Sequence, residues 1–295
     1  MKKWYRDYGL QARMMLTMFL LAALYLFFLV VLSEYGGIGT YGLIVFAGFF
    51  LLIQFFFSDK LVLWSMGGRI VSEQEEPRLH ETVSRLCAIA DLPKPKIAIV
   101  DSNIPNAFAT GKSKDSAVVA ITTSLKQKLS QPELEAVLAH ELSHVKNRDM
   151  LVITIASFLS TVAFFLVRNM LFFGMGGNRD RRGAGATIII FVVSLVVWII
   201  SFLLIRALSR YREFAADRGS AIITGQPSHL ASALMAISGV MERVPSRDLR
   251  EVEGMNAFFI IPAISGDSIM SLLSTHPTVE ARIRALEEME RRMEF

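Results

Sequence analysis

The hydrophobic residues of this chain are gathered into four long runs that are almost free of charged side chains. The runs are Met14–Leu32, Ile38–Phe57, Met150–Val167 and Ala184–Ile205. A helix needs about 20 consecutive apolar residues to cross the hydrocarbon core of a bilayer, and each run has roughly that length. The pattern therefore predicts four transmembrane helices in an integral membrane protein.

The composition agrees with this interpretation. Hydrophobic residues make up 53% of the chain and the mean hydropathy is +0.44, both high for a soluble globular protein. The first run is too long for the apolar region of a secretory signal peptide, and LSEYGG follows it where a small-residue cleavage site would stand. We therefore expect a retained membrane anchor.

Basic residues near the spans predict the orientation. Four of them precede the first run, namely Lys2, Lys3, Arg6 and Arg13, whereas the link SEYGGIGT after it has no Lys or Arg. Because cytoplasmic loops carry the excess of Lys and Arg, both termini and the polar segments should be cytoplasmic. The link between the third and fourth runs disagrees, since it carries Arg168, Arg179, Arg181 and Arg182. Either the N-terminal signal prevails or the second pair crosses only part-way, and we favour full crossing.

The runs divide the chain into four parts. Two spans occupy residues 1–57, a first polar segment 58–149, a hairpin of spans 150–205 and a second polar segment 206–295. In the first polar segment, the periodicity predicts a helix at Pro77–Leu92 and strands in KIAIVDS and DSAVVAITTSL. A further helix should begin at Gln131, because Ser130 and Glu133 form the pattern of a capping box.

The second polar segment should be helical throughout most of its length. The fourth run continues without a breaker to Gly225, and further helices are expected at His229–Arg243 and Pro277–Arg292, the last behind a cap at Ser274 or Thr275. The apolar stretch GMNAFFIIPAISGDS between them reads as a loop. The expected fold class is an α+β membrane protein, with four transmembrane helices and one mostly helical cytoplasmic domain that carries a small β-sheet.

The net charge and the cysteine content indicate which partners and which compartment to expect. The net charge is +4 and the isoelectric point about 9.2, but the basic residues flank the membrane runs or alternate with acids. The lipid bilayer with its anionic headgroups is therefore the expected partner, and nucleic acid is not. Cys87 is the single cysteine, so no internal disulfide can form, as suits a reducing cytoplasm.

The stretch AHELSHVKNRD carries the strongest chemical signal. His140 and His144 lie four residues apart, so on a helix both can reach one metal ion. Glu141 projects from a neighbouring angle and can touch a water on that metal, which is the H-E-x-x-H arrangement of zinc peptidases. The alternative is a surface helix with incidental histidines. Val137, Leu138 and Val145 flank the histidines and favour a partly buried face, where a metal would satisfy the imidazoles.

A catalytic zinc needs a third protein ligand, and SRYREFAAD supplies a candidate. Glu213 can ligate, and Asp217 on the same helical face can orient a ligand histidine. The alternative is a solvated charged face, given the surrounding Arg210, Arg212 and Arg218. At 1.5 Å per residue, both ligand-bearing points lie roughly 7–11 Å outside the membrane boundary. If the third and fourth spans pack as a hairpin, the three ligands converge close to the bilayer.

These residues resemble the HtpX-type membrane zinc metallopeptidases, a branch of the gluzincins that is related to the CAAX prenyl proteases. The likeness covers nearly the whole chain and includes NAFATG and STHP besides the two motifs above. The resemblance implies a gluzincin-like domain with one Zn2+ per chain. The implied ligands are His140, His144 and Glu213, with Glu141 as general base and Asp217 behind a ligand histidine.

The resemblance also implies residues at the substrate. Asn106 and Ala107 begin the stretch that is similar to the edge strand on which gluzincins lay the substrate backbone. His276 and Arg282 match a C-terminal pair, in which Arg282 would bind substrate and His276 would act in catalysis by stabilising the oxyanion. A helix-capping role for His276 is the alternative. His80 and His229 match nothing, and we expect them at the surface.

The expected function is zinc-dependent hydrolysis of internal peptide bonds. A site near the bilayer favours membrane-protein or other polypeptide substrates, cut in cytoplasmic regions. The resemblance implies quality control of misfolded membrane proteins in a bacterial cytoplasmic (inner) membrane under stress, alongside other membrane proteases. The alternatives are a non-catalytic zinc-binding scaffold or chaperone, a transporter, and a CAAX-type prenyl-protein peptidase. Structural zinc sites are usually built from several cysteines and histidines, so a single cysteine disfavours one here. Transport sites usually place ionisable groups within the spans, and these spans contain almost none.

Overall fold

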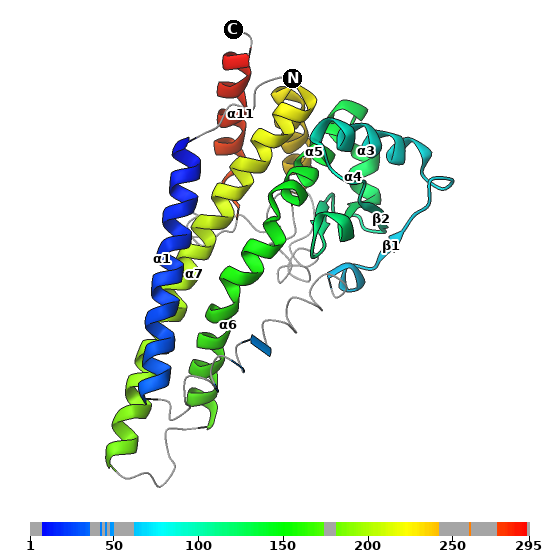
Figure 1. Ribbon diagram of the computed structural model, residues 1–295. Coiled ribbons are helices and arrows are strands. Elements are labelled where there is room, and N and C mark those ends of the chain that lie inside the picture. The colour runs from blue at the N-terminus through cyan, green and yellow to red at the C-terminus, as the bar shows by residue number, and fades with distance from the viewer. Residues whose placement is uncertain are drawn as a thin grey trace. The chain divides into compact units, whose positions relative to one another are not determined.

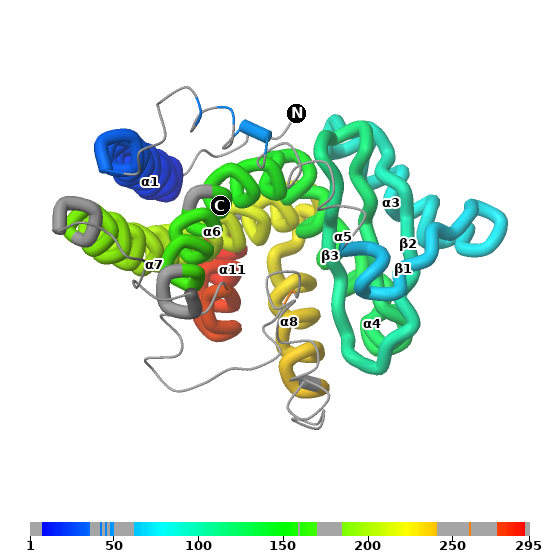
Figure 2. The backbone as a smooth tube through the Cα atoms, turned by 90° about the horizontal axis from the view of Figure 1, so that it is seen from below, coloured from blue at the N-terminus to red at the C-terminus, as the bar shows by residue number. Residues whose placement is uncertain are grey.

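The computed structural model describes residues 8–35, 42, 45, 48–49, 62–173, 181–241, 260 and 276–293. The chain forms two compact units (Figures 1 and 2). One combines Ser58–Leu151 with Ser209–Phe295 and a few N-terminal residues, and the other combines Asp7–Phe57 with Val152–Leu208. Each unit is therefore assembled from separate stretches of sequence.

The apolar unit is built from three long helices. These are α1 (Tyr8–Tyr35), α6 (Asp149–Phe173) and α7 (Arg181–Thr224), and among the described residues they are the helices long and apolar enough to cross a membrane. They contain the first, third and fourth predicted runs. The second run, Ile38–Phe57, lies outside the described residues except at isolated positions. The fold thus supports a membrane protein with at least these spans.

Packing within the apolar unit leaves many large side chains exposed. Phe28, Ala163 and Val197 are fully buried where α1, α6 and α7 meet, and the Tyr25 hydroxyl on α1 donates to the Ala156 carbonyl on α6 at 2.5 Å. The outward-facing side chains of these helices include many apolar residues, such as Phe19. Exposed apolar surface of this extent fits contact with lipid acyl chains.

The second unit contains a four-stranded sheet. Its strands are β1 (Gly68–Ile70), β2 (Lys96–Val100), β3 (Ala107–Thr110) and β4 (Val118–Thr122), in the order β1-β2-β4-β3. β2 and β4 are parallel, and the other two pairings are antiparallel. β3 therefore stands at an edge of the sheet.

Helices pack against this sheet and bury a common core with one of its faces. They are α3 (Pro77–Ala90), α4 (Thr123–Lys128), α5 (Gln131–Asn147), α8 (Pro227–Met241) and α11 (Val279–Met293), with the 3-10 turn η1 (Lys114–Ser116) before β4. Figure 2 shows the strands beside α3 and α5. The core contains residues such as Val83, Ile121, Leu138 and Leu234, so α3, α5, α8 and the sheet bury a common apolar surface.

The helices predicted in the two polar segments are present with small shifts, and other expectations for these segments are wrong. The stretch DSAVVAITTSL is a strand only to Thr122, whose hydroxyl then accepts from the Leu125 N–H at 3.2 Å and starts α4. His80 is buried rather than at the surface. The Val71 carbonyl, 3.1 Å from its Nε2, gives the buried ring a polar partner. The predicted cap residues Ser274 and Thr275 lie outside the described residues, and the cap prediction is wrong because α11 begins at Val279 behind Thr278.

Both ends of α5 follow from local chemistry. The helix begins at Gln131 as predicted, and the Ser130 N–H donates to Glu133 at 2.8 Å in a capping box. It ends at Asn147, because Arg148 adopts the left-handed conformation with φ of 56°. α6 starts at the next residue, Asp149. A single residue therefore joins the helix that carries the H-E-x-x-H motif to a helix long enough to span a membrane.

Candidate metal centre and active site

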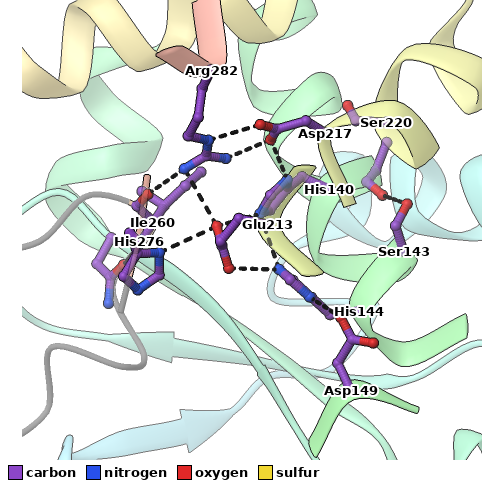
Figure 3. Close-up of polar contacts among 12 residues, drawn as sticks. His140, Ser143, His144, Asp149, Glu213, Asp217, Ser220, Ile260, His276 and Arg282 are labelled. Atoms are coloured by element: carbon purple, nitrogen blue, oxygen red, sulfur yellow. Dashed lines mark hydrogen bonds and ion pairs between the residues drawn. The ribbon is translucent and has the colours of Figure 1, made fainter. Parts of the chain in front are cut away.

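The two histidines of the motif lie side by side on α5. Their Nε2 atoms are 3.1 Å apart, and His140 is only 1% exposed (Figure 3). Glu213 on α7 faces both rings, with Oε2 3.6 Å from His140 Nε2 and Oε1 3.4 Å from His144 Nε2. One ligand atom from each of the three residues lies within 4.8 Å of the others. The two imidazoles and the carboxylate therefore point toward a common position.

Small residues allow α5 and α7 to approach closely enough for this convergence. Ser143 on α5 donates to the Ala139 carbonyl of its own helix at 2.7 Å, and Ser220 on α7 donates across to the Ala136 carbonyl at 2.6 Å. Between them Gly219 faces Ser143, and a Cβ at Gly219 would stand 2.6 Å from the Ser143 Cβ. A side chain at this position would force the two ligand-bearing helices apart.

A buried carboxylate stands behind His140. Asp217, one turn beyond Glu213 on α7, places Oδ1 2.9 Å from His140 Nδ1. Arg282 on α11 donates to Asp217 through Nε at 2.8 Å and Nη2 at 2.5 Å. The same guanidinium donates through Nη1 to the Ile260 carbonyl at 2.7 Å and lies 3.4 Å from Glu213 Oε2. Arg282 thus connects both acidic residues of α7 with α11.

The charges around the centre keep its carboxylates ionised. Burial works against ionisation of Glu213, but His276, His140 and His144 outweigh it and hold the pKa of Glu213 well below its usual value. Burial likewise opposes ionisation of Asp217, and the Arg282 charge overcomes it, so the pKa of Asp217 is also lowered. Both carboxylates are therefore available as anions to a cation or to an imidazole N–H.

The other predicted residues surround the same centre. Glu141 is buried on α5 next to His140. His276 is buried with Nδ1 3.2 Å from Glu213 Oε2, on the side of Glu213 away from His144 (Figure 3). Helix α11 begins at Val279, and Thr278 caps it by accepting from the Ala281 N–H at 3.3 Å. His276 is therefore not needed as the cap, which was its alternative role.

Asn106 and Ala107 lie at the sheet edge. Ala107 is the first residue of β3 and pairs with Ile121 of β4, and β3 packs against α5. The fully buried Asn106 accepts through Oδ1 from the Ile260 N–H at 3.0 Å. Because Arg282 donates to the carbonyl of that same Ile260, the two residues expected to bind substrate hold the backbone N–H and the backbone carbonyl of Ile260.

The donor set fits a catalytic zinc ion. Two imidazoles and one glutamate are a known three-ligand set of zinc hydrolases, which keep a fourth position open for water or substrate. The Nδ1 atom of His140 is held by Asp217, which leaves Nε2 to face the converging point. Since Glu213 and Asp217 are buried, the alternative of a solvated charged face is wrong.

Comparison with known proteins decides the family. Residues 73–290 match the model of peptidase family M48. The chain belongs to this family. It is 66% identical over 293 residues to Protease HtpX homolog 2 of Methanosarcina mazei, which covers 99% of both chains. It is 59% identical over 290 residues to the Protease HtpX homolog of Moorella thermoacetica, covering 98% of this chain and 97% of that one.

A solved structure supports the fold of the M48 chain. The crystal structure of S. mikatae Ste24p superposes with a TM-score of 0.57 at 19% identity, over 95% of this chain and 67% of that chain. At this identity the likeness concerns the fold alone. The predicted resemblance to HtpX-type peptidases is confirmed, and the protein is a metalloprotease with helices suited to a membrane.

Two residues of the M48 site were missed from the sequence. Asp149 places Oδ2 2.5 Å from His144 Nδ1, and Arg212 forms a buried ion pair with the other oxygen of Asp149. Each ligand histidine thus has a carboxylate behind it, and each carboxylate has an arginine. Asp149 stands five residues after His144, and this short spacing was the available signal. Arg212 is only 3% exposed, although it had suggested a solvated face.

Proposed function

We propose that this M48 protease is a zinc-dependent endopeptidase that cuts membrane proteins, misfolded ones among them, in regions exposed to the cytoplasm. The observation that supports it most strongly is the convergence of His140, His144 and Glu213, with ligand atoms within 4.8 Å of one another. One zinc ion held there would polarise the scissile carbonyl and make a water molecule acidic enough to lose a proton near neutral pH.

The acid–base work falls to Glu141. It lies directly after a ligand histidine on α5 and is buried beside the centre, where a carboxylate can take the proton of the attacking water. The same carboxyl group then passes the proton to the leaving amine. His276, buried 3.2 Å from Glu213, can donate a hydrogen bond to the oxygen on which negative charge develops.

Four residues keep this machinery in position. Asp149 accepts a hydrogen bond from the outer nitrogen of His144, and Asp217 lies 2.9 Å from the outer nitrogen of His140, so that each carboxylate orients one ligand ring. Arg282 and Arg212 neutralise these carboxylates in turn. We assign Arg282 to positioning rather than to substrate contact, because its described contacts are with Asp217, Glu213 and the Ile260 carbonyl.

The edge strand β3 offers a place for the substrate backbone. An extended peptide can add to an exposed sheet edge through main-chain hydrogen bonds. Ala107 begins this strand, and β3 packs against α5, which carries the histidines. Asn106 contributes by fixing the entry to β3: its N–H donates to Thr122 Oγ1 at 2.9 Å, and its side chain accepts from Ile260.

We infer the membrane setting from the sequence. We propose four transmembrane spans, including Ile38–Phe57, in a bacterial-type cytoplasmic (inner) membrane, with both termini and the active site in the cytoplasm. The support is the cluster of Lys and Arg before the first span and the absence of such residues in the link after it. Partners would be the lipid bilayer, membrane-protein substrates and other quality-control proteases. Recognition of prenylated peptides is not favoured by any observation on this chain.

A comparison of the wild-type protein with Glu141→Gln tests the proposal. The full chain is purified in detergent, and zinc content and cleavage of casein and of a destabilised membrane protein are measured with and without a chelator. Glu141→Gln should keep zinc and lose about 10²–10⁴-fold in cleavage rate, because it cannot accept the proton. A Gln variant that cuts as fast as the wild type contradicts the role of Glu141. Zinc binding without any chelator-sensitive cleavage by the wild type would instead favour a zinc-binding scaffold.

A further inference from the structure

A chain of buried polar contacts connects Asn106, the residue before β3, with the metal centre. The side-chain Oδ1 of Asn106 accepts from the Ile260 N–H at 3.0 Å, and the Ile260 carbonyl accepts from Arg282 Nη1 at 2.7 Å. Arg282 in turn donates to Asp217, the carboxylate behind His140 (Figure 3). All five residues belong to the unit that contains the metal centre. The backbone of Ile260 therefore links Asn106 to a proposed zinc ligand.

The first three residues of this chain are removed from solvent. Asn106 is 0% exposed, Arg282 1% and Ile260 2%, and Ile260 belongs to the apolar core shared by the sheet and its helices. A hydrogen bond that water does not reach is costly to break, because the separated donor and acceptor stay unpaired. A substrate would therefore have to displace the Ile260 backbone before it could contact the Asn106 side chain.

The end of β4 holds the backbone of Asn106 in place. The Asn106 N–H donates to Thr122 Oγ1, and the Asn106 carbonyl accepts from the Thr122 N–H, both at 2.9 Å. Thr122 is the last residue of β4, and its hydroxyl also accepts from the Leu125 N–H in the first turn of α4. The Asn106 side chain thus reaches Ile260 from a point that two elements of the core fix.

The Ile260 carbonyl holds one nitrogen of Arg282. Nη1 donates to this carbonyl and also lies 3.4 Å from Glu213 Oε2, so it faces both a backbone oxygen and a proposed metal ligand. The guanidinium is planar with N–H groups in fixed directions, and its Nε and Nη2 already bond to Asp217. Without the carbonyl, Nη1 would pair more closely with Glu213 and compete with a metal ion for that carboxylate.

We propose that Asn106 is a positioning residue of the metal centre. By holding the Ile260 N–H, it keeps the Ile260 carbonyl on Arg282 Nη1 and so leaves Glu213 available to zinc. The inference rests on the proposed zinc-peptidase function and replaces the substrate contact expected for Asn106. Two other roles make different predictions. Direct contact with substrate would place the effect of Asn106 in KM, and an Ile260 backbone that blocks the substrate site would make its release activating.

Asn106→Leu tests the proposal, because leucine has a similar volume but cannot accept from the Ile260 N–H. Zinc affinity of the full-length protein is measured by competition with a chromogenic chelator, and kcat and KM on one internally quenched peptide are determined per zinc-loaded molecule. We expect zinc affinity and kcat each to fall about tenfold, while KM changes less than about twofold. Asn103→Leu, at an exposed position of the same loop, is the matched control and should behave as the wild type. Where Asn106→Leu does not fold, Asn106→Ala carries the same expectations.

A double-mutant cycle with Arg282→Lys tests the route through the guanidinium. Lysine keeps a positive charge for Asp217, but it lacks the fork of nitrogens that bonds to Asp217 and to the Ile260 carbonyl together. If Asn106 acts through Arg282, adding Asn106→Leu to Arg282→Lys should lower zinc affinity by less than about a further twofold. Losses that multiply in the double variant show independent action and overturn the proposal.

Two other outcomes also overturn it. A raised KM with unchanged zinc affinity assigns Asn106 to the substrate. Faster cleavage by Asn106→Leu than by the wild type shows that the Ile260 backbone blocks the substrate site. The proposed function fails separately, if the zinc-loaded wild type shows no chelator-sensitive cleavage of any peptide. The comparison of zinc affinities then still decides the role of Asn106.

Discussion

Gly219 on α7 lies against Ser143 on α5, so that a Cβ added to the glycine would collide with the serine hydroxyl and stand 2.6 Å from its Cβ. This contact sets the separation of the two helices at the level of the metal centre. Glu213 lies less than two turns before Gly219, and His144 directly follows Ser143. The distance between the third ligand and the histidines therefore depends on the absence of one methyl group.

Gly219→Ala should weaken zinc binding, because the new methyl pushes α7 and Glu213 away from the imidazoles. We expect at least about a tenfold loss of affinity, as for other changes that displace a ligand support. Competition with a chromogenic chelator measures it. The exchange Ser143→Gly with Gly219→Ala keeps one small side chain at the contact and should restore most of the affinity. A single Gly219→Ala variant with wild-type affinity would show that the contact does not set the ligand geometry.

Asp149→Asn should lower zinc affinity about 10–100-fold, the usual effect of removing a carboxylate that orients a ligand histidine. The change also leaves Arg212 buried without its counter-ion, which can destabilise the fold by itself. The double variant Asp149→Asn with Arg212→Met removes both charges and separates the two effects. It should unfold like the wild type yet still bind zinc weakly. Asp115→Asn, at an exposed position in η1, serves as the control.

Arg282→Leu should destabilise the protein by about 3–5 kcal/mol, because it leaves Asp217 buried without its positive partner. Denaturant unfolding of the zinc-free protein in detergent measures the change without interference from the metal. Arg284→Leu on the same helix replaces an exposed arginine and should change the free energy of unfolding little. Equal stability of the two variants would argue against a structural role for the Arg282–Asp217 pair.

Cys87 should react slowly with alkylating reagents in the folded protein. Burial raises the pKa of its thiol from 9.0 to about 11, and the thiolate is the reactive form. At pH 8 the thiolate fraction is therefore about a hundredfold below that of an unperturbed thiol, and it rises as the pH approaches 11. The rate of iodoacetamide labelling against pH, compared with that in guanidinium, measures this. Labelling at the same rate in both conditions would contradict the burial of Cys87.

Features encoded within one element were predictable from the sequence. The start of α5 was found at its residue because the capping pair Ser130 and Glu133 lies only three positions apart. The spacing of His140 and His144 likewise needs only helix geometry. α7 was expected to run unbroken to Gly225, where the structure has a positive φ of 74° and the helix ends one residue earlier.

Features that depend on contacts between elements were harder to predict. Asp149 follows a helix end and reads as an ordinary first-turn acid, and only the fold places it behind His144. Arg212 reads as a solvated charge because the sequence does not state which neighbours bury it. β3 has only four residues, two of them alanines, so the strand signal is weak and the resemblance alone suggested it. The close approach of Gly219 to Ser143 could likewise not be predicted, because it depends on how α5 and α7 pack together.

The division of the metal unit between Ser58–Leu151 and Ser209–Phe295 has a consequence for biosynthesis. The ribosome releases the imidazoles of His140 and His144 first, and the carboxylate of Glu213 follows only after most of α6 and α7 has been made. A nascent chain therefore cannot coordinate the metal ion with all three side chains until both of these helices have been translated. The order of the gene therefore delays the protease activity until about three-quarters of the polypeptide has been made.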